Sequence, residues 1–260
     1  MTVTERRQEI LAIINKEGNM RASELAERFH VTAETIRKDL IYLNNKRLLK
    51  KGHGSAQPIN EFMEYPMDLR LQENTSIKKA IARKAAEYIC DCNVIFIDAG
   101  STLMELAKLM TPHPQLVIIT NSFSVVQALK NTGNTIYFIG GEVNPVTQST
   151  SGLWATNELS SIRIDITFLG TSGFQTHTGP CTKILSDAQF KKEVVKNSNK
   201  IIVLADHTKF SSNAIMQYAD WTEVDLLISD SNVTPEQRSL LQDEVDLILV
   251  NPSDAEMNAF

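Results

Sequence analysis

Apolar side chains recur at helical spacing in three short runs within the first 57 residues. The first run begins near Thr4 and ends at Gly18, because glycine takes the left-handed conformation that follows a helix without steric cost. Ser23 is the expected N-cap of the second helix, and Thr32 is the expected N-cap of the third. The apolar positions are, helix by helix, Ile10, Leu11, Ile13 and Ile14, then Leu25, Ala26 and Phe29, then Ile36, Leu40 and Leu43.

The third helix presents polar residues between its apolar positions, and a short basic run with glycines follows it. A first helical turn that is small and hydroxylated can approach base edges in a DNA major groove, while cations behind it hold phosphates. Leu48 and Leu49 are expected to begin a small β-wing, so residues 1–57 are predicted to form a winged helix-turn-helix DNA-binding domain. The expected DNA-binding residues are Thr32, Ala33, Thr35, Arg37 and Lys38 on the helix, and Lys50, Lys51 and His53 on the wing.

Two of these residues have alternative roles. Arg37 either contacts a phosphate or a guanine, or forms a surface salt bridge with Glu34 or Asp39. His53 either contacts phosphate or packs inside the wing. The pattern as a whole favours DNA contact for Arg37, and it leaves the two roles of His53 equally open.

Charge is distributed unevenly along the chain. Residues 1–57 hold 11 Lys and Arg against 7 Asp and Glu, a net charge of +4, and residues 58–260 hold 15 against 24, a net charge of −9. A basic segment gains affinity for nucleic acid by releasing counterions from the phosphates, although a solvated surface would show the same charge run. The distribution therefore supports a DNA-binding domain joined to an acidic remainder.

Beyond residue 73, apolar runs rich in β-branched residues alternate with helical patterns, the clearest of which span residues 78–89, 102–110 and 188–197. Such alternation predicts an α/β domain over residues 74–260, with a mostly parallel sheet covered by helices. Residues 58–73 contain Pro58 and Pro66 and are typical of a linker. The runs expected to form strands span residues 94–97, 116–119, 136–139, 166–169, 201–204, 226–228 and 247–250.

Small, polar and glycine residues follow five successive predicted strands. The carboxyl ends of parallel strands meet at one crevice, where ligands of open α/β sheets bind. Ser101 and Thr102 open a helix whose free N–H groups suit a phosphate, Lys209 can balance its charge, and the hydroxyl groups suit a sugar or polyol. The candidate ligand-binding residues at these strand ends are Asp98, Gly100, Ser101, Thr102, Thr120, Asn121, Ser122, Gly140, Gly141, Thr171, Ser172, Asp206 and Lys209.

Each of these loops has a simpler explanation when it is taken alone. A Gly-Ser-Thr sequence is more often a turn than a phosphate site, Asn121 and Ser122 could cap the next helix, and Lys209 could be a surface lysine. Five such loops at successive strand ends are harder to explain by chance. We therefore expect a ligand crevice at the carboxyl edge of the sheet.

The N-terminal pattern resembles the DeoR family of bacterial transcriptional regulators. That family shows an Arg near the N-terminus, Glu-Leu-Ala in the second helix, Thr-Ile-Arg-Arg-Asp-Leu in the recognition helix and His-Gly-Gly-Ala in the wing. Lys38 replaces an arginine here, which keeps the charge but loses a bidentate fork, and Ser55 replaces the second wing glycine. The matching residues are Arg7, Glu24-Leu25-Ala26, Thr35-Ile36-Arg37-Lys38-Asp39-Leu40 and His53-Gly54-Ser55-Ala56.

The remainder resembles the sugar-phosphate-sensing domain of the same family, whose fold is related to sugar-phosphate isomerases such as ribose-5-phosphate isomerase. The family's motifs there are Asp-x-Gly-Ser-Thr, Thr-Asn-Ser, Gly-Gly and Asp-x-x-Lys-Phe. They stand here at residues 98–102, 120–122, 140–141 and 206–210. An acidic residue before the late helix, usually Glu, stands here as Asp187, and the resemblance implies that it contacts the ligand.

The resemblance implies a transcriptional regulator, a repressor of a carbohydrate-utilisation operon that is controlled by a phosphorylated sugar. We expect a homodimer or homotetramer on double-stranded DNA, because paired DNA-binding domains match paired half-sites. One alternative is an isomerase with a DNA-binding domain, for which Asp98, Asp187, Asp206 and Lys209 are candidate acids and bases. The related isomerases place acidic residues in the loop that corresponds to residues 170–173, and this loop lacks a carboxylate here, so the resemblance argues against enzymatic activity. Another alternative is an architectural DNA-binding protein with an inert second domain.

Several classes of protein are not expected. The sequence has no apolar run long enough to cross a membrane and no signal peptide at its N-terminus. Cys90, Cys92 and Cys181 are expected to be reduced thiols of a cytoplasmic protein, since residues 90 and 92 are too close for a relaxed disulfide. The five histidines are scattered, so we expect no metal and no cofactor apart from the sugar-phosphate effector.

Overall fold

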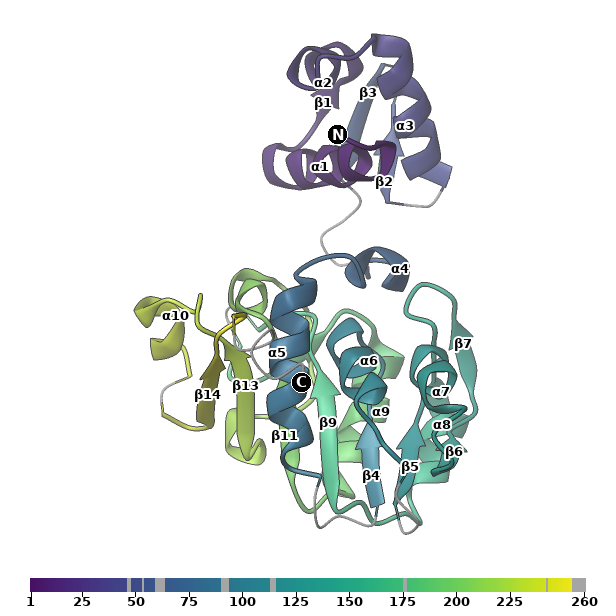
Figure 1. Ribbon diagram of the computed structural model, residues 1–260, viewed down its shortest axis with the longest axis vertical. Helices are drawn as coiled ribbons and strands as arrows, with labels where there is room; N and C mark the ends of the chain where they lie inside the picture. The colour runs from purple at the N-terminus through teal and green to yellow at the C-terminus, as the bar shows by residue number, and fades with distance from the viewer. Residues whose placement is uncertain are drawn as a thin grey trace. The chain divides into compact units, whose positions relative to one another are not determined.

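The computed structural model describes residues 1–45, 48–52, 54–58, 64–89, 94–112, 116–174, 177–241 and 243–253. Contacts between Cα atoms divide the chain into two compact units, Met1–Met63 and Glu64–Phe260 (Figure 1). We call the first unit the head and the second unit the body. His53, Cys90 and Cys92, for which the sequence suggests roles, lie outside the described residues.

The described part of the head contains three α-helices, α1 (Val3–Glu17), α2 (Ala22–Arg28) and α3 (Ala33–Asn45). A capping box between Thr2 and Glu5 starts α1, and Gly18 ends it with φ of 84°. The Thr32 hydroxyl accepts a hydrogen bond from the Thr35 N–H at 3.2 Å, so Thr32 caps α3 as predicted. Of the predicted apolar positions, the helices bury Ile10, Leu11, Ile14, Leu25, Ala26, Ile36, Leu40 and Leu43. Ile13 and Phe29 are only half-buried.

The described wing is an antiparallel sheet of three strands in the order β1 (Met20–Arg21), β3 (Ser55–Pro58) and β2 (Leu49–Lys51). The sequence predicted a wing that begins at Leu48 and Leu49, but it did not predict β1. Ser23 is not the N-cap of α2, because the strand pairing keeps the chain extended only to Arg21 and the helix begins at Ala22. The Glu24 carboxylate accepts a hydrogen bond from the Arg21 N–H at 2.8 Å at this helix start instead.

The described part of the body is built on a sheet of seven strands, all of whose pairings are parallel. The seven predicted runs are these seven strands, with ends that differ by at most two residues, and the predicted mostly parallel α/β fold is confirmed. In spatial order the strands are β14 (Asp246–Val250), β13 (Leu226–Asp230), β11 (Ile201–Leu204), β9 (Ile166–Gly170), β4 (Val94–Ile97), β5 (Val117–Thr120) and β6 (Thr135–Phe138).

Helices cover both faces of the sheet, because alternate strand residues point to opposite sides. Ile95 and Ile97 pack with α5 (Thr75–Ala86), α6 (Ser101–Lys108) and α7 (Phe123–Leu129). Phe96 packs on the other face with α8 (Gly152–Leu159) and α9 (Leu185–Lys196). In Figure 1, α5 and α6 lie in front of the strands.

Shorter elements complete the described body. β7 (Glu142–Asn144) pairs with β8 (Ser149–Ser151), and β10 (Cys181–Thr182) pairs with β12 (Met216–Gln217), both antiparallel. The remaining helical segments are α4 (Met67–Arg70), η1 (His207–Ser211), η2 (Trp221–Glu223) and α10 (Pro235–Ser239). Among the described residues, no helix is both long and apolar enough to cross a membrane.

Residues 64–73, which the sequence assigns to a linker, contain α4 and contact the body. The Met67 N–H donates to the Val146 carbonyl at 2.9 Å, and the Gln148 side chain donates to Asp68 at 2.9 Å. Met67 is buried. The linker limits of residues 58 and 73 stay a prediction. Cys181 is a buried free thiol in the described part of the chain, and burial raises its pKa to about 12.

Candidate DNA-binding surface and ligand crevice

The outward face of α3 is polar, because its apolar residues pack into the head. Arg37 and Lys38 are exposed, and Ala33 and Thr35 are half-buried. The Arg37 guanidinium lies 3.3 Å from the Glu34 carboxylate, and both side chains are more than half exposed. The salt bridge that the sequence offered as an alternative for Arg37 is therefore present in the protein without DNA, with Glu34 as its partner.

Asp39 has a different role. Its side chain is 2% exposed, and its two carboxylate oxygens accept hydrogen bonds from the Nε atoms of Arg6 and Arg7 at 2.7 Å each. The Arg7 guanidinium also lies 3.8 Å from the centre of the Tyr42 ring. These contacts join α1 to α3, so Asp39 and Arg7 hold the recognition helix in place. The sequence did not identify this buried cluster.

Of the three wing residues that the sequence assigns to DNA binding, Lys50 and Lys51 lie among the described residues. Lys50 and Lys51 are exposed on β2, the strand that follows α3 in the sequence. The Lys51 N–H donates to the Asn44 side chain at 2.9 Å, which ties the wing to the end of α3.

The order of the strands places the predicted crevice between β4 and β9. From β4 the chain adds strands on one side through β6 and then crosses over to β9 on the other side, which is the kind of switch point where open α/β sheets bind ligands. Asp98 follows β4 and is fully buried. Its Oδ2 atom accepts hydrogen bonds from the Gly170 N–H at 2.9 Å and from the Lys191 ammonium at 2.7 Å.

Lys191 is a buried cation that pairs with both Asp98 and Asp187, and the sequence did not identify it. It also donates to the Gly170 carbonyl at 3.0 Å, and the Tyr218 hydroxyl donates to the same carbonyl at 2.9 Å. Burial would lower the pKa of Lys191, but the carboxylates of Asp187 and Asp98 raise it above its ordinary value. Lys191 is therefore charged at neutral pH.

Asp187 lies in the first turn of α9, in the same cluster. Its Oδ2 atom accepts a hydrogen bond from the Thr182 hydroxyl at 2.6 Å and lies 3.6 Å from the Lys191 ammonium. Burial raises the pKa of Asp187. The structure thus brings the residue implied by the family resemblance next to Asp98.

The loop after β4 opens α6, as the sequence predicted. Gly100 is the N-cap, and Ser101 and Thr102 form the buried first turn. The first N–H groups of a helix have no partner within the helix, so this turn offers donors to an anion. A Cβ atom on Gly100 would lie 2.9 Å from the terminal methyl of the Leu103 side chain, which would have to shift.

The loop after β5 makes hydrogen bonds that stabilise the fold. The Ser122 hydroxyl accepts from the Val125 N–H at 3.3 Å and caps α7, as the simpler explanation predicted. The Thr120 hydroxyl accepts from the Ser122 N–H at 3.1 Å. Asn121 is fully buried and donates to the Thr150 carbonyl at 2.8 Å, but its Oδ1 atom has no hydrogen-bond partner among the described residues.

The backbone at the two glycines after β6 also contacts other parts of the body. The Gly140 N–H donates to Glu158 at 3.2 Å. Gly141 has φ of 145°, and a Cβ atom there would lie 2.6 Å from the Ser151 carbonyl. The Thr171 hydroxyl lies within hydrogen-bond distance of the Gly173 carbonyl in its own loop and of the Cys181 carbonyl on β10. The Ser172 hydroxyl donates to Glu64.

A second group of charges lies at the end of β11. Asp206 accepts hydrogen bonds from Thr208, and although burial would raise its pKa, the charge of Lys209 and the Thr208 bonds hold the pKa below its ordinary value. Lys78, on α5, is buried, and burial lowers its pKa to about 8. Lys209 therefore lies among buried charges. No metal-binding group of three or more His, Cys, Asp or Glu occurs among the described residues.

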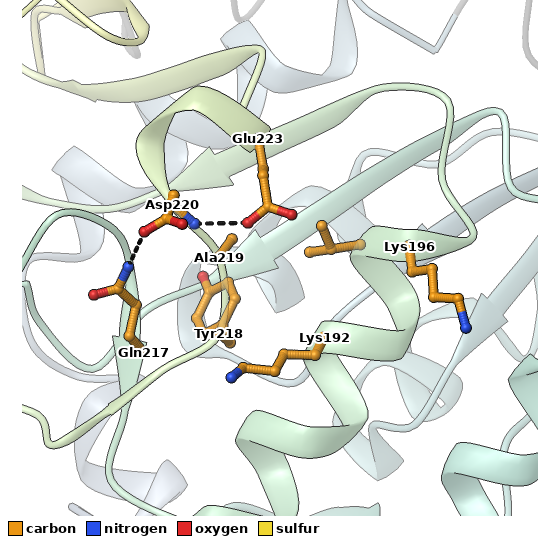
Figure 2. A pocket seen from close by; sticks show the side chains of 8 residues that line it. Lys192, Lys196, Gln217, Tyr218, Ala219, Asp220 and Glu223 are labelled. Atoms are coloured by element: carbon orange, nitrogen blue, oxygen red, sulfur yellow. Dashed lines mark hydrogen bonds between the residues drawn. The ribbon is translucent and has the colours of Figure 1, made fainter.

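A separate open pocket lies between α9, β12 and η2 (Figure 2). Lys192 and Lys196 line one side, and Asp220 accepts a hydrogen bond from Gln217 and donates its N–H to Glu223 at 2.9 Å. No predicted ligand-binding residue lines this pocket. Tyr218 lines it, but the Tyr218 hydroxyl reaches the crevice at Gly170.

In a comparison with known proteins, the head and the body each match a protein-family model. Residues 6–62 match the DeoR-like helix-turn-helix domain, and residues 73–231 match the DeoR C terminal sensor domain. The uncharacterized HTH-type transcriptional regulator YulB of Bacillus subtilis is 34% identical over 94% of this chain and 95% of that protein. The glycerol-3-phosphate regulon repressor of Shigella flexneri is 29% identical over 89% of this chain and 92% of that protein. A solved transcriptional regulator from Streptococcus pneumoniae is 14% identical, with a TM-score of 0.44 over 79% of this chain and 97% of that chain.

The motif in α3, the parallel sheet with its polar strand ends, the two family-model matches and the sequence match to YulB point to the same assignment. Both units match in the family's order, and the matched relatives align along nearly the whole chain. The chain belongs to the DeoR family of transcriptional regulators.

Proposed function

We propose that this chain represses a carbohydrate-utilisation operon and that a phosphorylated sugar bound in the crevice of the body controls its binding to DNA. The observation that carries the proposal is that one chain contains both an exposed polar helix in the head and a cluster of charged, buried side chains at a strand switch point in the body. One relative is named as a repressor of a glycerol-3-phosphate regulon, which is consistent with a phosphorylated effector. We place the protein in the cytoplasm, as a homodimer or homotetramer.

The exposed face of α3 and the wing are the proposed DNA contacts. The Arg37–Glu34 pair is exposed, and such pairs contribute about 0–1 kcal/mol, so Arg37 can exchange Glu34 for a phosphate or a base at little cost. Lys38, Lys50 and Lys51 are exposed cations around it. We assign Thr35 and Ala33, in the first turn of α3, to contacts with base edges.

The crevice suits a ligand with a phosphate at one end and hydroxyl groups at the other. Ser101 and Thr102 offer the N–H groups of a helix start, and Lys209 offers a cation. Asp98 Oδ1 and Asn121 Oδ1 are buried acceptors without a partner in the described part of the chain. Buried polar atoms normally have partners, and the hydroxyl groups of a sugar would supply two donors.

The geometry favours binding over catalysis. The hydrogen bonds from Lys191 and from the Gly170 N–H both end on Oδ2 of Asp98 and fix the carboxylate, so that Oδ1 can accept a hydrogen bond from a ligand hydroxyl. The loop after β9 carries Thr171 and Ser172 in place of carboxylates. We therefore propose a sensor without isomerase activity, in which the ligand acts through unequal affinity for two arrangements of the protein.

The proposal is tested by effector binding and by DNA binding together. Selection of binding duplexes from a random library gives an operator, and a gel shift on it is repeated with a panel of sugar phosphates and the matching free sugars. We expect at least one sugar phosphate to change operator affinity, and at 100 times its Kd to stabilise the protein by roughly 2.7 kcal/mol. Equal effects of free sugars, or no effect of any ligand on operator affinity, would contradict the proposal. Interconversion of the sugar phosphates by pure protein would instead support the isomerase alternative.

A further inference from the structure

Glu64 is the first residue of the body and lies in a stretch that neither family match covers, since the matches end at residue 62 and begin again at residue 73. It precedes α4 and belongs to no helix or strand. Its side chain is nevertheless only 8% exposed. A buried carboxylate is costly unless it is paired, so the contacts of Glu64 inside the body require an explanation.

The partners of Glu64 belong to the crevice. One carboxylate oxygen accepts a hydrogen bond from the hydroxyl of Ser172, in the loop after β9, and the other lies 3.9 Å from the Arg70 guanidinium. Burial alone would raise the pKa of Glu64, but the charge of Arg70 and the Ser172 hydroxyl lower it. The charges of Lys183 and Lys191 lower the pKa further, so that it lies below its ordinary value. Glu64 is therefore an anion at neutral pH.

Arg70 has more donors than Glu64 satisfies. The 3.9 Å separation is too long for a hydrogen bond, and the buried Nε and Nη2 atoms of Arg70 have no partner among the described residues. A guanidinium presents its donors as a planar fork that matches the oxygens of a phosphate or carboxylate. Arg70 could therefore donate hydrogen bonds to an anion that places more oxygens beside it than Glu64 does.

Arg70 also adjoins the charges at the end of β11. Burial raises the pKa of Glu73, and the charges of Lys209 and Arg70 both oppose that rise. The same two cations act on Lys78, whose ammonium donates to the Arg70 carbonyl. Arg70 thus belongs to the same electrostatic neighbourhood as Lys209, the cation assigned to the effector phosphate.

Glu64 differs from Asp98 and Asp187 in its place in the chain, because it stands ahead of α4 in the segment that leads to the head. Asp98 accepts two hydrogen bonds at the end of a central strand, and Asp187 lies on a helix beside Lys191. Glu64 has one hydroxyl bond and one ion pair beyond hydrogen-bond distance. We propose that Glu64 is an internal anion that occupies the anion site at Arg70 and Ser172, and that the effector phosphate displaces Glu64 and binds Arg70.

This inference rests on the proposed function and explains how ligand binding reaches the DNA-binding unit. Glu64 is joined to the last strand of the head, β3, by residues 59–63 alone. When the phosphate takes its place, the chain that leads to the head is released from the crevice. The effector therefore acts on the segment between sensor and DNA-binding domain without contacting DNA.

The test uses inorganic phosphate, and then the best sugar phosphate, with the full chain. Glu64→Gln removes the competing charge and keeps the shape, so we expect it to bind phosphate at least about fivefold more tightly than wild type, the low end of typical coupling between sites. Arg70→Gln should bind several-fold more weakly, and Arg70→Lys should recover part of the loss. Amide hydrogen exchange over residues 64–71 of the wild type should become faster when phosphate is added, a measurement that needs no variant.

Asp68→Asn is the matched control, because Asp68 is an exposed carboxylate on the same segment that bonds only to Gln148 among the described contacts. It should leave phosphate affinity unchanged. If Glu64→Gln binds phosphate no more tightly than wild type, or if exchange over residues 64–71 does not change, Glu64 is not a competing anion, although sugar-phosphate control can still hold. If the wild type binds neither phosphate nor any sugar phosphate, the inference and the proposed function both fail.

Discussion

Replacing Asp39 with asparagine is expected to lower the stability of the head by about 2–3 kcal/mol. The carboxylate accepts two hydrogen bonds at 2.7 Å from Arg6 and Arg7, whose side chains are 11% and 25% exposed. Bonds to charged groups contribute roughly 1.5–3 kcal/mol each. An asparagine keeps one acceptor oxygen, but its amide N–H groups face a guanidinium that also carries only donors. Because Arg7 is partly exposed, the expected loss of stability is smaller than for a fully buried ion pair.

This loss is large for so small a unit. At about 0.05–0.15 kcal/mol per residue, the 63 residues of the head have a stability of roughly 3–9 kcal/mol. Each kcal/mol shifts the midpoint of a domain of this size by about 4–8 °C, so the head of the variant should melt roughly 10–20 °C lower. Both tryptophans, Trp154 and Trp221, lie in the body, so tryptophan fluorescence follows the body and far-UV circular dichroism follows both units.

Circular dichroism of Asp39→Asn should therefore show an early transition that fluorescence does not show. Glu34→Gln makes the same change of charge on the same helix, but its carboxylate is 64% exposed beside Arg37, so its cost should stay below about 1 kcal/mol. An Asp39→Asn head that melts with the wild type, or a Glu34→Gln head that loses as much, would refute the assignment of Asp39 as the link between α1 and α3.

Three further predictions concern the proposed contacts. Arg37→Ala should weaken specific DNA binding by about 1–3 kcal/mol with an unchanged circular dichroism spectrum, and wild-type affinity in a gel-shift titration would remove Arg37 from the base contacts. Lys50→Ala or Lys51→Ala should weaken all DNA sequences alike and lower the salt slope by about one unit, so an unchanged slope would exclude phosphate contact by the wing. Ser101→Asp should retain DNA binding and lose the effector response, because its carboxylate repels the phosphate; a normal thermal shift with sugar phosphates would show that the phosphate binds elsewhere.

The seven strands of the sheet were predictable because strands buried on both faces consist of continuous apolar runs. Ile201–Leu204, for example, is apolar throughout and fully buried. The antiparallel pairs β7–β8 and β10–β12 were not predicted, because strands of two or three residues are too short to show alternation. β1 was missed for the same reason, and with it the true start of α2 at Ala22.

The residues at the strand ends were predictable from their position after apolar runs, but their partners were not. Lys191 stands beside Lys192 in the sequence and has the pattern of a solvated helix face, yet it is buried against Asp98. Arg70 and Glu64 lie in a stretch whose prolines suggested a linker. A buried charge is stabilised by partners distant in the chain, and local patterns contain no information about them.

The charge balance of the crevice indicates why such a site can serve as a switch. A ligand that binds two arrangements with equal affinity shifts neither, however tightly it binds. In the proposed switch, an incoming phosphate meets an anion at Arg70 while Glu64 is in place. After Glu64 has moved away, the phosphate meets a guanidinium whose Nε and Nη2 atoms have no partner among the described residues, so the two arrangements differ in affinity for anions. A neutral sugar would interact almost equally with both arrangements. Under the proposal, the carboxylate at residue 64 therefore ties the response of the protein to the phosphate of its effector rather than to the sugar alone.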